Sequence, residues 1–211
     1  MWTRILQLLL IPTDFELDWI PTSLKDEWLQ RGHRIDICGF GICLSGIRTM
    51  QILASLDVER VILLGIAGFF VDASSLGKAI RFARVAVHGI GVGEGCDHRS
   101  ASELGWFQWP REPRIGGSLD LGYSDASQDG PLLLSVASAS KDTDEASVRH
   151  SKFRDAVAED MEGFAVAAAC RLRGIPCEII RGISNRAGDR EHRNWQVREA
   201  LSSAMTMALT I

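Results

Sequence analysis

Apolar runs recur along the chain at intervals that predict strands alternating with helices. The run at residues 61–68 is apolar at nearly every position, as in a strand covered on both faces by helices. The pattern predicts strands at residues 5–12, 35–39, 61–68, 81–88, 132–137 and 177–183. It predicts helices at residues 17–31, 47–54, 144–156, 163–173 and 196–209. Such alternation is typical of an α/β protein with an open sheet.

Residues 158–185 combine several signals in one stretch. An acidic turn with Asp160 and Glu162 opens an alanine-rich helix, and carboxylates in a first helical turn keep their charge easily because unpaired backbone N–H groups point toward them. A glycine and a proline end the helix, and the strand that follows ends in Ser184 and Asn185. Ligands of open α/β sheets bind outside the carboxyl ends of strands, so this Ser-Asn pair is predicted to lie at a binding edge.

Composition bounds the domain organisation and the class of partner. The chain has 211 residues, of which 46% are hydrophobic and 24% charged, and it contains no linker-like segment, so residues 1–211 are predicted to form a single domain. The net charge is −4. A nucleic-acid surface requires a basic face, so a small-molecule partner is favoured over nucleic acid.

The cysteines and the N-terminal apolar run bear on location. Five cysteines, an odd number without Cys-x-x-Cys spacing, favour reduced thiols over disulfides or a metal site. The run at residues 5–12 is short and lacks a small-residue cleavage site, so it is predicted to be a buried strand and not a signal peptide. No run approaches the roughly 18 apolar residues of a membrane span. We therefore predict a cytoplasmic protein with no membrane partner.

Two motifs resemble those of a known family. Residues 159–167 read Glu-Asp-Met-Glu-Gly-Phe-Ala-Val-Ala, and residues 181–185 read Arg-Gly-Ile-Ser-Asn. The pair resembles the nucleoside phosphorylase/nucleosidase superfamily, and within it the futalosine hydrolases, nucleosidases of the alternative menaquinone pathway. Methylthioadenosine/S-adenosylhomocysteine nucleosidases share the Met-Glu motif but end the strand in Ser-Asp, so Asn185 directs the resemblance toward the futalosine branch. A weaker resemblance extends over most of the chain.

The resemblance implies a fold and a reaction. The fold is a three-layer α/β/α sandwich around a central twisted sheet that is mostly parallel or mixed. The reaction is hydrolysis of the N-glycosidic bond of a 6-oxopurine nucleoside, which for futalosine yields hypoxanthine and dehypoxanthinylfutalosine. Cleavage passes through an oxocarbenium-like ribose, as in other glycoside hydrolysis. The resemblance implies a homo-oligomer, and it implies no metal and no cofactor.

The resemblance also assigns roles to residues of this chain. By its place in Thr-x-x-Glu after the first strand, Glu16 corresponds to the glutamate that activates the attacking water. Glu162 would accept both ribose hydroxyls, a bidentate task suited to a carboxylate. Asn185 would contact N7 and the 6-substituent of the purine. The other substrate-binding candidates are Met161, Ser184, Ala67, Gly68 and Phe164.

Two of these signals have simpler interpretations. From spacing alone, Asp14 or Glu16 could cap the following helix, and only the downstream motif favours catalysis. Gly39-x-Gly41 lacks the third glycine of a dinucleotide fingerprint, because Leu44 stands at that position. It is equally consistent with a plain strand-to-helix turn and with a turn beside the ribose, as the resemblance implies.

Other functions remain open at this point. A phosphorylase would need a cation for phosphate in the loop after the first strand, whereas residues 12–16 of this loop are acidic. An adenine-releasing nucleosidase is a further alternative. The segment at 89–98 and the turn at 138–143 depart from the family pattern, which suggests a catalytically inactive nucleoside-binding protein as an alternative of another class.

Two groups of residues in less regular segments are further candidates. The aromatic side chains of Trp106, Phe107 and Trp109 are interpreted either as a subunit interface or as part of a pocket. Futalosine carries a benzoate on its side chain, and its carboxylate needs a cationic partner. The candidate partners are Arg190, Arg99 and Arg111, each of which could equally be a solvated surface arginine.

Overall fold

The computed structural model describes residues 5–71, 73–121 and 130–211. The strands are β1 (Ile5–Ile11), β2 (Arg34–Ile37), β3 (Val58–Phe69), β4 (Ala79–Phe82), β5 (Arg84–His88), β6 (Gly91–Val92), β7 (Arg99–Ser100), β8 (Ser118–Asp120), β9 (Leu132–Val136), β10 (Ala156–Asp160) and β11 (Cys177–Arg186). The α-helices are α1 (Asp14–Trp19), α2 (Thr22–Gln30), α3 (Gly41–Ser55), α4 (Thr143–Lys152), α5 (Gly163–Arg173) and α6 (Val197–Ala208). None of the helices in these residue ranges is both long enough and apolar enough to cross a membrane.

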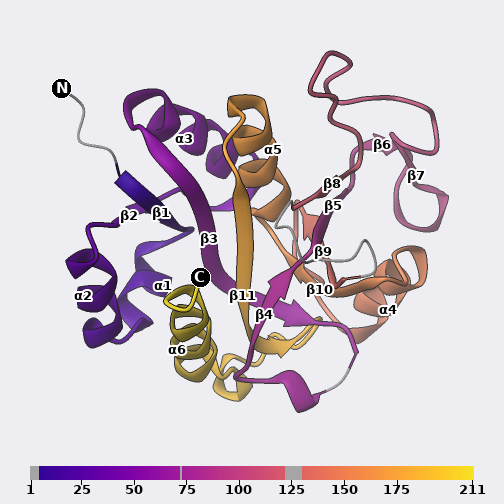
Figure 1. Ribbon diagram of the computed structural model, residues 1–211. Helices are drawn as coiled ribbons and strands as arrows, with labels where there is room; N and C mark the ends of the chain where they lie inside the picture. The colour runs from indigo at the N-terminus through magenta and orange to yellow at the C-terminus, as the bar shows by residue number, and fades with distance from the viewer. Residues whose placement is uncertain (1–4, 72, 122–129) are drawn as a thin grey trace.

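The central sheet is mixed and mostly parallel. In the described chain its order is β2-β1-β3-β10-β9-β5-β8, with β11 beside β3 and β4 beside β11. The parallel pairs are β1 with β2, β1 with β3, β3 with β11, β9 with β10 and β5 with β9. The antiparallel pairs are β3 with β10, β4 with β11 and β5 with β8. Figure 1 shows β3 and β11 running side by side through the middle of the molecule.

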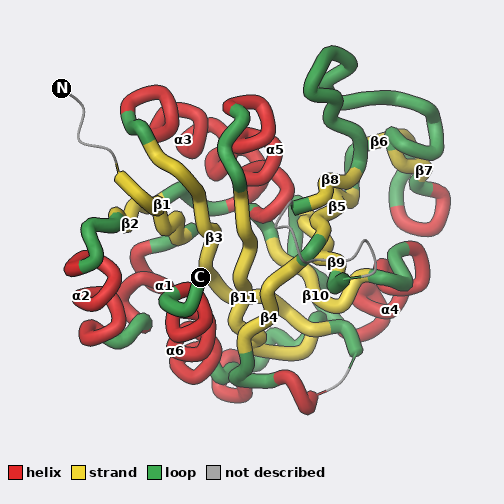
Figure 2. The backbone as a smooth tube through the Cα atoms, in the orientation of Figure 1, coloured by secondary structure: helices red, strands yellow, loops and turns green. Residues whose placement is uncertain are grey.

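Helices cover both faces of this sheet, which confirms the expected three-layer sandwich (Figure 2). On one face α3 and α5 pack together over β3 and β11, and their buried side chains include Leu53 and Cys170. On the other face α1, α2 and α6 enclose a second core around Trp28 and Met205. The apolar run predicted at 61–68 lies in β3, between these two layers, with Val61, Ile62, Leu63 and Leu64 fully buried. Burial on both faces explains why the run shows no alternation.

Small side chains let α3 and α5 approach closely. A Cβ added at Gly46 would lie 3.3 Å from the Cβ of Ala165, so both helices need small residues at this contact. The helix predicted at 163–173 has the predicted bounds, and Gly174 ends it in the left-handed conformation at φ 67°. The small residues of the family motif therefore serve helix-to-helix packing as well as packing against the sheet.

Four predicted elements differ clearly from the observed ones, and one of them is the helix predicted at 47–54, which begins earlier, at Gly41. The helix predicted at 17–31 is two helices, because Pro21 lacks a backbone N–H and holds Ile20 in an extended conformation. The strand predicted at 81–88 divides at Ala83, where the chain leaves β11 and joins β9. The helix predicted at 144–156 ends at Lys152, and a strand that the pattern did not predict, β10, begins at Ala156. Alanine favours helices locally, but here its small side chain lies fully buried in the sheet.

Candidate active site

The carboxyl ends of β1, β3, β10 and β11 surround a cavity of about 280 Å³. The strands β1, β3 and β11 are parallel and end at the same edge of the sheet. The antiparallel strand β10 reaches this edge because it pairs with the last residues of β3, where Glu159 lies opposite Gly68. The lining residues are Thr13, Phe15, Glu16, Phe40, Ile66, Ala67, Gly68, Ala139, Glu159, Asp160, Met161, Glu162, Ser184, Asn185, Arg190 and Trp195. Seven of the eight predicted site residues are among them.

Glu16 faces this cavity from the first turn of α1. The helix is capped by Thr13, whose hydroxyl accepts from the Glu16 backbone N–H at 3.2 Å, so capping does not require the Glu16 side chain. The Glu16 carboxylate instead accepts from the Ile66 backbone N–H at 3.0 Å and from the Thr13 hydroxyl at 2.7 Å. Burial raises the pKa of Glu16, although Arg181 opposes the shift. These contacts fix a carboxylate at the cavity wall and leave it able to take up a proton.

Glu162 is the second buried carboxylate of the cavity. Its Oε1 accepts from the Gly41 backbone N–H at 3.0 Å, and its Oε2 accepts from Arg181 Nη2 at 3.1 Å. Burial raises the pKa of Glu162 to about 7, and Asp160 adds to the shift while Arg181 opposes it. The Gly-x-Gly turn therefore contacts the predicted ribose-binding carboxylate directly.

Arg181 is a central residue that the sequence pattern did not reveal. Its side chain is 0% exposed, and it donates from Nε and Nη2 to Asp160 Oδ2 at 3.0 and 2.5 Å as well as to Glu162. A Cβ at Gly65 would collide with Arg181 Nη1 and lie 2.7 Å from Glu16 Oε1, so the glycine makes room for the cation beside both glutamates. The sequence does contain a signal for Arg181, because an arginine inside the apolar strand run 177–183 requires buried partners for its charge.

Asp160 supports the site without presenting a free oxygen. Its Oδ1 accepts from the Ser135 hydroxyl at 2.6 Å, and its Oδ2 accepts from the Gly163 backbone N–H at 2.8 Å in addition to Arg181. Asp160 is the last residue of β10 and not part of the helix, but it still binds the N-terminus of α5, as the acidic turn predicted. The Ser135 hydroxyl in turn accepts from the Phe164 backbone N–H at 2.8 Å.

The Asn185 amide has a defined orientation. Its Nδ2 donates to the Arg186 carbonyl at 2.8 Å and to the Asp189 carbonyl at 3.3 Å, while its Oδ1 accepts from the Ser184 hydroxyl at 2.7 Å. A flipped amide would place Oδ1 against two carbonyl oxygens, so the network sets the orientation. Oδ1 keeps one lone pair for a ligand. A donor for a ligand becomes available when Nδ2 releases the longer bond, that to Asp189.

Of the remaining predicted residues, some line the cavity and one lies in the hydrophobic core. Ala67, Gly68 and Met161 line the cavity, and a Cβ at Gly68 would lie 3.2 Å from the Cα of Ala187, so this glycine also lets two main-chain segments approach. Phe164 does not line the cavity, because its side chain is buried in the core between α5 and the sheet. The helix turns its second residue away from the cavity, and a substrate contact for Phe164 is not supported.

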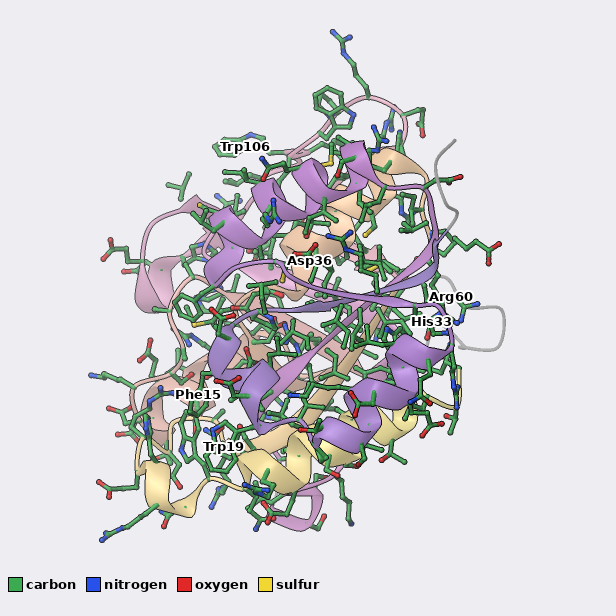
Figure 3. All side chains as sticks on the ribbon, turned by 90° about the vertical axis from the view of Figure 1, so that its left-hand side faces the viewer. Phe15, Trp19, His33, Asp36, Arg60 and Trp106 are labelled. Carbon is green, nitrogen blue, oxygen red and sulfur yellow. The ribbon has the colours of Figure 1, made fainter. Side chains whose placement is uncertain are left out.

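The mouth of the cavity carries aromatic side chains and one arginine. Phe15 and Phe40 are exposed there, and the Arg190 guanidinium lies 5.1 Å from the centre of the Trp195 ring. Arg99 and Arg111 lie outside this cavity. Trp106, Phe107 and Trp109 are exposed and also lie outside it, and Figure 3 shows Trp106 far from Phe15.

The side chains of the site are suited to acid–base chemistry. Its carboxylates face one cavity and are held by backbone N–H groups, hydroxyls and Arg181, as described above. Within residues 5–71, 73–121 and 130–211, no group of three or more His, Cys, Asp or Glu side chains has the arrangement of a metal site. A water molecule in reach of Glu16 could be deprotonated there, and a sugar with two adjacent hydroxyls could bind Glu162.

Comparisons with known proteins show what this chain is similar to. The family model described as Phosphorylase superfamily matches residues 131–211. The chain is 30% identical over 152 residues to a futalosine hydrolase of Thermus thermophilus, and 24% identical over 148 residues to a futalosine hydrolase of Streptomyces coelicolor. Each alignment covers 69% of this chain, and they cover 66% and 61% of the two relatives. The chain thus spans slightly less than two thirds of either relative.

Solved structures share the whole fold. A futalosine hydrolase of Helicobacter pylori superposes with a TM-score of 0.75 at 15% identity, covering 98% of this chain and 97% of that chain. The 5′-methylthioadenosine/S-adenosylhomocysteine nucleosidase of the same organism, bound to butyl-thio-DADMe-Immucillin-A, gives a TM-score of 0.73 at 17% identity, with the same coverage of both chains. At these identities the likeness establishes the fold.

Proposed function

We propose that the chain is a member of the phosphorylase superfamily, and that it is a nucleosidase that hydrolyses the N-glycosidic bond of a 6-oxopurine nucleoside, with futalosine as its substrate. The products would be hypoxanthine and dehypoxanthinylfutalosine, and the reaction would belong to menaquinone biosynthesis. The observation that carries the proposal is the convergence of Glu16, Glu162 and Asn185 on one cavity. Each residue supplies one of the three tasks of the reaction.

The proposed mechanism follows from the charges of the cavity. Glu16 in its ionised form takes a proton from water, and the water oxygen attacks C1′ of the ribose. The bond between C1′ and the purine nitrogen breaks, and its electron pair leaves with the base. Glu162 holds the two ribose hydroxyls, and the carboxylates around the sugar stabilise the positive charge that develops on it. The departing base takes up a proton at N7 from solvent and leaves as neutral hypoxanthine, and Asn185 Oδ1 accepts a hydrogen bond from that N7–H.

Hydrolysis is favoured over phosphorolysis by the surroundings of the attacking group. Arg181 is a buried cation beside Glu16 and Glu162 that does not line the cavity, and it donates to Asp160 and Glu162. It is therefore neutralised by carboxylates and not free to bind phosphate. The loop at 12–16 adds Glu16 and no cation, so phosphate would meet negative charge where the nucleophile must bind.

We also propose that a second copy of the chain covers the mouth of the cavity. Phe40 directly precedes α3, and Leu44 and Ile47 lie in its first two turns. Their side chains are 63%, 57% and 65% exposed. Phe15, at the mouth, is 56% exposed, so the apolar surface continues to the cavity. Exposed apolar surface of this kind marks an interface, and a homo-oligomer would bury it. The free thiols of Cys38, Cys43, Cys170 and Cys177 support the proposal of a reducing, cytoplasmic location.

Arg190 is the proposed partner of the carboxylate on the substrate side chain. It lines the cavity, whereas Arg99 and Arg111 do not, and no hydrogen bond or ion pair joins it to another residue in the described ranges. Its stacking on Trp195 holds the guanidinium at the mouth, where a charged substituent would remain near solvent.

The proposal is tested by separating the products of three nucleosides by liquid chromatography. Futalosine, inosine and methylthioadenosine are each incubated with the protein, with and without inorganic phosphate. We expect release of hypoxanthine from futalosine, independent of phosphate. A requirement for phosphate would identify a phosphorylase, and preferential release of adenine would identify an adenine nucleosidase. An absence of turnover on all three, combined with binding of a nucleoside, would identify an inactive binding protein.

A further inference from the structure

The turn between β9 and α4 is held by a single buried arginine on α4. Arg149 donates from Nη1 to the Ser140 hydroxyl at 2.9 Å and to Glu159 Oε2 at 3.1 Å. From Nη2 it donates to Glu145 Oε1 at 2.7 Å. The residue is 7% exposed and does not line the cavity. One guanidinium therefore holds two carboxylates from different elements, Glu145 of α4 and Glu159 of β10.

Both carboxylates also accept hydrogen bonds from backbone N–H groups of the turn. Glu159 accepts from the Ser140 backbone N–H at 2.8 Å and from the Ser140 hydroxyl at 2.8 Å. Glu145 accepts from the Lys141 backbone N–H at 3.0 Å. Two successive N–H groups of the turn are thus bound to carboxylates that Arg149 holds in place. The planar fork of arginine suits this task, because its donors point in fixed directions.

The restrained turn forms part of the cavity. Ala139 lines it, and so does Glu159 on the neighbouring strand. Both oxygens of Glu159 are engaged by Ser140 and Arg149, so this carboxylate is not available to a ligand. Without the arginine, a buried negative charge would stand unpaired in the cavity wall.

The same turn supports the loop that orients Asn185. At Gly188 (φ 86°) an added Cβ would collide with the backbone of Asp142 and lie 2.7 Å from the backbone nitrogen of Thr143, so the two segments are in direct contact. Gly188 lies between Arg186 and Asp189, whose carbonyls accept from Asn185 Nδ2. A shift of the turn would therefore move the carbonyls that set the orientation of the Asn185 amide.

We propose that Arg149 is a positioning residue for the purine-binding end of the cavity. It acts through Glu159 and Glu145 on the turn, and through the contact at Gly188 on the loop that orients Asn185. This inference rests on the proposed function, because it takes the base to bind at Asn185. Misplacement of binding groups by about 1 Å can cost about 10²-fold in rate, so a restraint outside the cavity can control recognition.

The test measures KM and kcat of Arg149→Met with futalosine, together with thermal stability. We expect KM to rise at least about tenfold with a smaller fall in kcat, because the groups that bind the base are displaced while Glu16 is not. Arg149→Lys should recover stability but not KM, because one ammonium group cannot bind both carboxylates in a fixed geometry. The double variant Arg149→Met, Glu159→Gln also removes the unpaired charge of Glu159. Its KM tests the proposal if the single variant does not fold.

Arg60→Met is the matched control. Arg60 pairs with the buried carboxylate of Glu178 at 3.0 Å, and Figure 3 shows it on the opposite side of the view from Phe15 at the cavity. It should lose stability and keep the wild-type KM. A wild-type KM in Arg149→Met or in the double variant would overturn the proposal, as would an equal rise of KM in Arg60→Met. If the wild-type protein cleaves no nucleoside, the proposed function is wrong. That result differs from an unchanged KM in the Arg149 variants, which would overturn only the role of Arg149.

Discussion

Arg181 Nη2 donates to Glu162 Oε2 at 3.1 Å, and the two side chains expose only 0% and 6% of their surface. The charge of the carboxylate proposed to hold the ribose therefore depends on a cation that does not line the cavity. Burial favours the neutral form of Glu162 and Arg181 favours the charged form. Substrate binding and protein stability should therefore both change with pH as Glu162 gains or loses its proton.

The first prediction concerns stability against pH. The pKa of Glu162 rises from 4.5 in the unfolded chain to about 7 in the folded chain, so the folded chain binds an extra proton between these values. The stabilisation is complete below about pH 4.5 and is lost as pH rises through 7. Glu162→Gln cannot ionise, so at pH 8 it should be more stable than wild type by about 2 to 3 kcal/mol, with little difference near pH 5. Urea unfolding at both pH values measures this difference.

The exposed Glu112→Gln serves as its control and should match wild type at both pH values. A stability difference between Glu162→Gln and wild type that is the same at pH 5 and pH 8 would show that Glu162 is ionised throughout.

The second prediction concerns the base that activates water. Glu16→Gln keeps the shape of the side chain but cannot accept a proton, so kcat should fall about 10²- to 10⁴-fold while nucleoside binding changes little. Because burial raises the pKa of Glu16, the wild-type rate should fall on acidification at a higher pH than for an ordinary glutamate. Single-turnover rates and equilibrium binding separate the two effects. The exposed neighbour Asp14→Asn should keep its rate. Loss of rate in Asp14→Asn in place of Glu16→Gln would reassign the base.

A third prediction concerns the sugar. If Glu162 accepts both ribose hydroxyls, wild type should cleave inosine more efficiently than 2′-deoxyinosine, and Glu162→Ala should lose this preference. An unpaired buried polar group costs about 1 to 3 kcal/mol, so we expect a preference of about 10- to 100-fold in kcat/KM. Equal efficiency of wild type on the two sugars would mean that Glu162 does not bind the 2′-hydroxyl.

The fourth prediction concerns the purine. A 6-oxopurine with a proton on N7 offers a donor to Asn185 Oδ1 and an acceptor to Nδ2, once Nδ2 releases its 3.3 Å bond to the Asp189 carbonyl. Adenine would set an amino group against Nδ2. Wild type should therefore prefer futalosine over its adenine analogue by up to about 10⁴-fold in kcat/KM. Asn185→Asp should narrow or invert this ratio, whatever its absolute rate. An unchanged ratio in Asn185→Asp would place base discrimination on another residue.

Much of the fold follows from local patterns in the sequence. The helix at 163–173 was predicted with its observed bounds, because an acidic turn begins it and Gly174 ends it. The strand at 61–68 was predicted because burial on both faces leaves a continuous apolar run. The strand β10 was not predicted, because its alanines favour a helix and only the neighbouring strands make it extended.

The site was predicted as far as its residues occupy motif positions. Glu16, Glu162 and Asn185 line one cavity, as three motifs far apart in the sequence suggested. Arg181 was missed, because its role depends on carboxylates that only the folded sheet brings near. Phe164 was included through its place beside the Met-Glu pair, but the direction of its side chain depends on the helix that begins there.

The proposed function requires that water, and not phosphate, attacks the nucleoside at Glu16. It is tested most directly by incubating the protein with futalosine in phosphate-free water enriched in the heavy oxygen isotope, followed by mass spectrometry of the products. We expect one labelled oxygen in the sugar product and unlabelled hypoxanthine, with turnover by Glu16→Gln reduced about 10²- to 10⁴-fold. Absence of turnover without phosphate, or cleavage that Glu16→Gln leaves intact, would contradict it.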